Sequence, residues 1–145
     1  MRLKKGGKLP YDYAVEWVKE KYKYTDEEIK KAQEFYFGHS IKVIREVSSF
    51  QDDWDDAVAW DIHEIIESIH AYRAGFKPNF RDRNLYEQKQ PYHLKAVEAE
   101  IKYLISKNRR DLIDKLYKNT LELKKLSIDK MLERSGLPAE KMKVV

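Results

Sequence analysis

The sequence predicts an all-α protein, because apolar residues recur at helical spacing along most of its 145 residues. No stretch of it alternates apolar and polar residues in the way that is typical of a half-buried strand. Only five glycines and four prolines interrupt the chain, which favours long helices. The expected architecture is an antiparallel bundle of four long helices plus a short N-terminal helix, with flexible basic termini.

The start of the bundle is predicted from signals in the first residues. Residues 1–9 contain four bases and no acid, which favours a flexible basic arm. Pro10 fits the first turn of a short helix that we expect to end near Tyr22. We therefore expect a single helical-bundle domain over residues 10–136.

A second helix is expected from Thr25 to Phe50. Thr25 and Glu28 form a capping-box pattern at its start, and apolar residues keep helical spacing beyond them. Gly38 interrupts this spacing and costs about 1 kcal/mol relative to alanine inside a helix. We therefore expect either close packing or a bend at Gly38.

The most distinctive helix is expected at residues 52–74, and the rest of the chain is predicted to pack around it. This segment has seven acids and one base, so its charge is −6, and the remainder of a chain of net charge +4 carries +10. Its apolar residues recur at spacings of three and four, which predicts a buried stripe along one side. The members of this stripe are Trp54, Val58, Ile62, Ile65, Ile69 and Tyr72.

The opposite face of this helix has an unusual composition. It presents Trp60, His63, Glu67 and His70, where an ordinary surface helix presents solvated charges. One interpretation is that a second helix covers part of this face and buries Trp60. The other is that the face binds a partner through Trp60, because tryptophan is enriched at the energetic centres of protein interfaces.

The C-terminal half is expected to contain a long loop and two further helices. Residues 75–91 mix bases with aromatic residues and show neither helical nor strand spacing, so they are predicted to form a loop. Such a composition suits contact with nucleic acid. It also suits a loop whose aromatic residues anchor it to the core, which is the interpretation we favour. Helices are expected at 92–106 and 109–134, followed by a basic tail at 137–145.

Composition narrows the class of protein. The chain has no cysteine, which excludes disulfides and thiolate metal sites. Charged residues make up 37% of it, a balance that resembles proteins of hyperthermophiles. No apolar run is long enough to span a membrane, and the start lacks the core of a signal peptide, so we expect a cytoplasmic protein. Although the sequence pI is about 9.0, the bases are scattered, so only weak and non-specific binding of nucleic acid is expected.

The residues that could support catalysis form no complete motif in the sequence. Glu67 and His70 have the Glu-x-x-His spacing of di-iron carboxylate bundles, but the sequence contains no second copy. The run from His63 to Glu67 departs from the zinc protease motif, because Glu67 stands where that motif has its second histidine. His63, Glu67 and His70 could still form a metal-binding face on one helix. On balance we expect no metal, no cofactor, no small-molecule substrate and no enzymatic activity.

A resemblance to a known family is carried by the tract from Asp55 to Phe80, DDAVAWDIHEIIESIHAYRAGFKPNF, together with the chain length and the helical plan. These features resemble the small helical-bundle proteins of two-tailed archaeal viruses. One member of that family is a virion protein, and another is an inhibitor that occupies the DNA-binding channel of the host RNA polymerase. The resemblance implies a helical bundle that acts by binding inside the host cell.

The leading hypothesis is therefore a viral inhibitor that binds the host RNA polymerase in its DNA-binding channel and represses transcription. A channel lined with bases would attract the acidic helix, while affinity would come from an anchor such as Trp60. The residues expected to bind the partner are Asp52, Asp53, Asp55, Asp56, Trp60, His63, Glu67, Lys77, Arg81, Arg83, Lys141 and Lys143. The alternatives are a DNA-binding virion or architectural protein and a metal-carboxylate bundle enzyme.

Overall fold

The described part of the chain is helical. A computed structural model describes residues 2–75 and 85–118, and it describes residues 85–91, 117 and 118 by their backbone alone. Within these ranges the chain forms six α-helices and one short 3-10 helix, without a strand, which confirms the predicted all-α class. The elements are α1 (Pro10–Tyr22), α2 (Asp26–Phe37), α3 (Ile41–Val47), η1 (Ser48–Phe50), α4 (Trp54–Arg73), α5 (Leu85–Ser106) and α6 (Arg110–Lys118).

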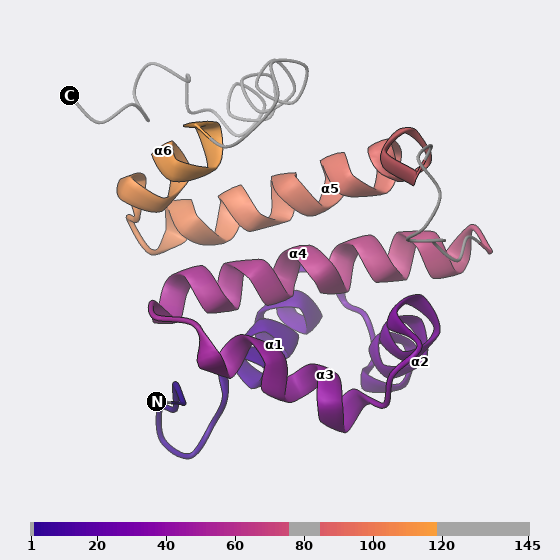
Figure 1. Ribbon diagram of the computed structural model, residues 1–145, viewed down its shortest axis with the longest axis horizontal. Coiled ribbons are helices and arrows are strands. Elements are labelled where there is room, and N and C mark those ends of the chain that lie inside the picture. Colours follow the sequence, from indigo (N-terminus) through magenta and orange to yellow (C-terminus); the bar gives the residue numbers. More distant parts are fainter. Residues whose placement is uncertain (1, 76–84, 119–145) are drawn as a thin grey trace.

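Helix α4 lies in the middle of the molecule, between two layers of helices (Figure 1). Helices α1 and α2 pack against it on one side, and α5 packs against it on the other. Helices α4 and α5 lie side by side and run in opposite directions, and α6 contacts α5 (Figure 1). This position explains why 12 of the 20 residues of α4 are buried.

The hydrophobic core extends over both sides of α4. Val58, Ile62, Ile65 and Ile69 are fully buried, as the apolar stripe predicts. The two ends of the predicted stripe are less buried than its middle. Trp54 is only partly buried, and Tyr72 is 38% exposed at the last turn. Buried polar contacts also join α1, α2 and α4. The Tyr11 hydroxyl donates to Gln33 Oε1 at 3.1 Å, and Gln33 Nε2 donates to Ser68 Oγ at 2.7 Å.

The prediction of one helix from Thr25 to Phe50 was wrong, because Gly38 divides it. Gly38 has a φ of +70°, and its N–H donates to the carbonyl oxygen of Glu34 at 2.9 Å, which ends α2 at Phe37. A Cβ at Gly38 would meet nothing within 4 Å, so the glycine provides a left-handed turn and not a close approach. The chain changes direction there and continues as α3 and η1.

The predicted boundaries on the C-terminal side also change. Helix α5 begins at Leu85, so the loop expected over 75–91 extends too far into what is helix. Most of the predicted helix at 109–134 and the whole tail at 137–145 lie outside the described residues. The bundle of four long antiparallel helices therefore stays a prediction.

The N-terminal segment contacts the body of the protein, although the sequence predicted a flexible arm. The backbone N–H of Leu3 donates to the carbonyl oxygen of Ser49 at 2.7 Å, and Leu9 is only 1% exposed. The hydrogen bond attaches Leu3 to η1, and burial of Leu9 attaches the other end of the segment to the core. In the ranges that the structure describes, no helix has the length and apolar character needed to cross a membrane.

Candidate functional site

An exposed apolar surface lies where α3 meets α4. Trp60 on α4 is 39% exposed, and Val43 and Val47 on α3 are each more than half exposed. Together with Phe37 and Ile44 these residues line an apolar groove, which we call the Trp60 surface. The groove also contains polar residues, which are Gln33, His39, Asp61 and Glu64. A second helix, α5, covers the part of this face that carries His63 and Glu67, but Trp60 stays exposed and is not buried as the first interpretation expected. Binding of a partner through Trp60 stays a hypothesis.

The acidic start of α4 is largely paired within the chain. Arg109 contacts Asp53 at 2.8 Å and Asp55 at 3.0 Å, and Lys115 contacts Asp56 at 3.3 Å. The hydrogen bond from Arg109 lowers the pKa of Asp53 below its usual value. Asp53 also caps α4 by accepting from the N–H of Asp56. Three of the four aspartates expected to face a partner thus already face bases of their own chain, whereas Asp52 is exposed.

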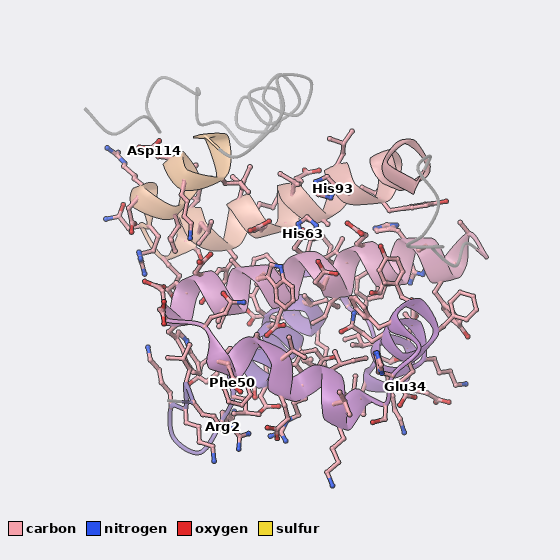
Figure 2. The ribbon with its side chains drawn as sticks, viewed as in Figure 1. Arg2, Glu34, Phe50, His63, His93 and Asp114 are labelled. Carbon is pink, nitrogen blue, oxygen red and sulfur yellow. The ribbon has the colours of Figure 1, made fainter. Side chains whose placement is uncertain are left out.

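A buried polar cluster lies between α2, α4 and α5. His63 Nδ1 is 2.9 Å from Glu100 Oε1, and His63 Nε2 is 3.1 Å from Glu67 Oε2. His93 Nδ1 is 3.2 Å from the same Glu67 oxygen, and the Tyr36 hydroxyl donates to Glu67 Oε1. We call these five residues the His63 cluster. His63 on α4 and His93 on α5 lie in the space between the two helices (Figure 2).

The charges in the His63 cluster are set by its partners. Burial would raise the pKa of Glu67, but hydrogen bonds from His63 and His93 lower that pKa well below its usual range. Burial would likewise lower the pKa of His63, but hydrogen bonds to Glu100 and Glu67 raise it to about 10. Near neutral pH, His63 is therefore a cation that lies between two carboxyl groups.

A second buried carboxyl group on α4, that of Asp61, has a raised pKa, whereas the pKa of Glu67 is lowered. Asp61 is 3% exposed and accepts a hydrogen bond from the hydroxyl of Ser48 in η1. Burial raises the pKa of Asp61 to about 8, although the Ser48 hydrogen bond acts against this shift. Asp61 is therefore protonated and uncharged near neutral pH, and it contributes no charge to the Trp60 surface.

The structure corrects part of the predicted partner-binding set. His63 and Glu67 were expected to face a partner, but both are buried against α5 and are not available for direct contact. His70, which the sequence grouped with them, is half-buried, and burial lowers its pKa. Lys77, Arg81, Arg83, Lys141 and Lys143 lie outside the described residues.

Sequence reasoning missed His93 and Glu100 on α5. Their spacing of seven residues places them on one face of a helix, two turns apart, and that spacing was the available signal. The contact between this face and the pair His63 and Glu67 depends on helix packing, which sequence spacing does not reveal.

Comparisons with protein-family models, with curated proteins and with solved structures find no match for this chain.

Proposed function

We propose that the protein acts by binding another protein, and that its partner is the RNA polymerase of an archaeal host. In this proposal it is a viral inhibitor that occupies the DNA-binding channel of the polymerase and represses transcription, and it is not an enzyme. The observation that carries the proposal is the Trp60 surface. The identity of the partner rests on the resemblance of the Asp55–Phe80 tract to the viral helical-bundle family.

The Trp60 surface has the chemistry of a docking site. Contiguous apolar side chains on a protein surface commonly mark an interaction site. Ala59 and Asp61, the neighbours of Trp60 in the sequence, are almost completely buried, so the helix that presents Trp60 is firmly held in the core. A rigid aromatic side chain loses little conformational freedom on binding, which favours its use as an anchor.

Electrostatic attraction is expected to have a smaller part than the sequence indicated. Because Arg109 and Lys115 already pair with three of the aspartates, a basic channel would have to compete with these contacts. Long-range attraction mainly raises the rate of association, whereas buried anchors slow dissociation. We therefore assign affinity to the Trp60 surface and orientation to the charge of α4.

Substitution of Trp60 by alanine tests the proposal. Loss of an aromatic anchor commonly costs about 2 kcal/mol or more of binding free energy, so Trp60→Ala should dissociate from purified host polymerase roughly 30 times faster. Val47→Asp should have a similar effect, because it places a charge in the groove and leaves Trp60 in place. The matched control is Tyr72→Ala, which removes a similarly exposed aromatic residue (38%) from the other end of α4.

The kinetic measurement is made beside thermal unfolding of each variant. Unchanged dissociation of both Trp60→Ala and Val47→Asp would remove the Trp60 surface as the docking site. If the wild-type protein does not bind polymerase, the partner is wrong. Tight binding to duplex DNA that persists at physiological salt would favour the DNA-binding alternative.

A further inference from the structure

Three possible ligand atoms of the His63 cluster lie close together between α4 and α5. His63 Nε2, Glu67 Oε2 and His93 Nδ1 all lie within 4.8 Å of one another. The separations that join each histidine to Glu67 Oε2 are 3.1 Å and 3.2 Å. A tetrahedral zinc ion with bonds of about 2.0–2.1 Å holds its ligand atoms roughly 3.3–3.4 Å apart. The two separations from Glu67 Oε2 are close to this value, whereas the two histidine nitrogens, which lie within 4.8 Å of each other, would move closer together around such an ion.

The outer partners of these atoms are also those that a metal site requires. A metal-binding histidine usually donates its second ring N–H to a carboxylate, which fixes its tautomer. Glu100 lies at 2.9 Å from His63 Nδ1 and can accept that proton, which leaves Nε2 for a cation. The Tyr36 hydroxyl holds the other oxygen of Glu67, so that Oε2 is oriented towards the two histidines.

The residues of the cluster lie on packed helices, and one side of the cluster is accessible. His63 and Glu67 are four residues apart on α4, and the Glu67 side chain is only 1% exposed. The side chain of His93 is 22% exposed, which provides a route by which a hydrated cation can reach the cluster. Ligand atoms on packed helices keep their geometry better than ligand atoms on loops.

We propose that His63, Glu67 and His93 bind one divalent first-row transition cation, with zinc as the best match. Two imidazoles and one carboxylate are ligands that zinc and iron both accept, and three protein ligands leave a fourth position for water. His63 Nε2 and His93 Nδ1 each donate a proton to Glu67 Oε2, so both nitrogens must give up that proton when the cation binds. The proton of His63 Nε2 is released to solvent, and the proton of His93 Nδ1 is either released or replaced by one on Nε2 of the same ring. The bound cation joins α4 to α5. This site is independent of the Trp60 surface, so either proposal can fail alone.

The test is a titration of the tag-free, full-length protein with zinc chloride after removal of metals by a chelator. Calorimetry, together with elemental analysis after dialysis, should show one zinc ion per chain with a dissociation constant in the micromolar range or below. Substitutions of outer partners typically weaken metal binding by about 10–100-fold, so Glu100→Gln should fall in that range. His93→Ala, which loses a ligand, should weaken binding at least as much.

The matched control is His70→Ala, because His70 lies on α4 but outside the three ligands. This variant should bind zinc like the wild type, and zinc should raise the melting temperature of both proteins but not that of His93→Ala. Circular dichroism establishes that His93→Ala is folded, and Glu67→Gln provides a second ligand variant of nearly unchanged shape. Failure of the folded wild type to bind zinc, or unchanged binding by both ligand variants, would overturn the proposal.

Discussion

Asp61 and Glu67 are two buried carboxyl groups on the same helix, and their charges differ. Their exposed fractions are similar, 3% for Asp61 and 1% for Glu67. Asp61 has a neutral hydroxyl partner and a raised pKa, whereas Glu67 has two histidine partners and a lowered pKa. The chemistry of the partner, and not the degree of burial, therefore decides whether each of these carboxyl groups is ionised.

The largest effect is expected when the charged cluster loses its cation. His63→Ala would leave Glu67 and Glu100 buried without the side chain that lies between them. Removal of one partner from a buried ion pair typically costs about 3–5 kcal/mol, and we expect the free energy of unfolding to fall by that amount. Denaturant unfolding measures this loss, with the exposed His39→Ala as control. A loss no larger than that of the control would show that the cluster is uncharged.

The neutral carboxyl group of Asp61 should make the free energy of unfolding depend on pH. The pKa of Asp61 rises from 3.8 to about 8 on folding, so the folded protein holds this proton more tightly than the unfolded chain. This contribution to stability is complete below pH 3.8 and is lost as the pH rises towards 8. Between pH 5 and 7 the loss is about 1.4 kcal/mol for each pH unit.

Asp61→Asn isolates this contribution, because asparagine has a similar shape and does not titrate. The free energy of unfolding is measured for both proteins at several pH values, and the difference between them is plotted. Other groups that titrate nearby, such as His70, are present in both proteins and cancel. A difference that does not change with pH would mean that Asp61 is ionised in the folded protein, like Glu67.

The smallest effect is expected at the exposed end of α4. Arg109 pairs with Asp53 and Asp55 where water still reaches them, so its attraction is screened. We expect Arg109→Lys to lower the free energy of unfolding by roughly 1 kcal/mol at low salt and by less at high salt. Lys115→Ala, which removes one longer contact, should cause a smaller loss. A loss as large as that of His63→Ala would show that water does not screen the ion pairs of Arg109 with Asp53 and Asp55.

The sequence predicted the all-α class and the central position of the acidic helix, because both depend on the local spacing of apolar residues. Val58, Ile62, Ile65 and Ile69 repeat every three or four positions, and the structure buries all four of them. Trp60 also emerged from the sequence, since a large aromatic residue stands out on a polar face.

The remaining features depend on contacts between distant residues. The position of Gly38 allowed a bend or close packing, and only the backbone shows that the helix ends there. The sequence predicts a loop that extends to Pro91, yet the backbone is helical from Leu85 onward. The site formed by His63 and His93 requires α4 and α5 to run in opposite directions with a particular offset. Such an offset is set by packing and is absent from either helix alone.

Because helices pack against α4 on both sides, the position of α4 also affects how the protein unfolds. Amide protons exchange with solvent only when their hydrogen bonds break, and deeply packed helices exchange through global unfolding. Separation of α5 alone would expose the charged His63 cluster to water, while loss of α1 or α2 would expose the buried isoleucines. Neither layer can leave without exposing one side of α4, so the amides of its middle turns should be the slowest to exchange. The described helices should therefore unfold as one cooperative unit.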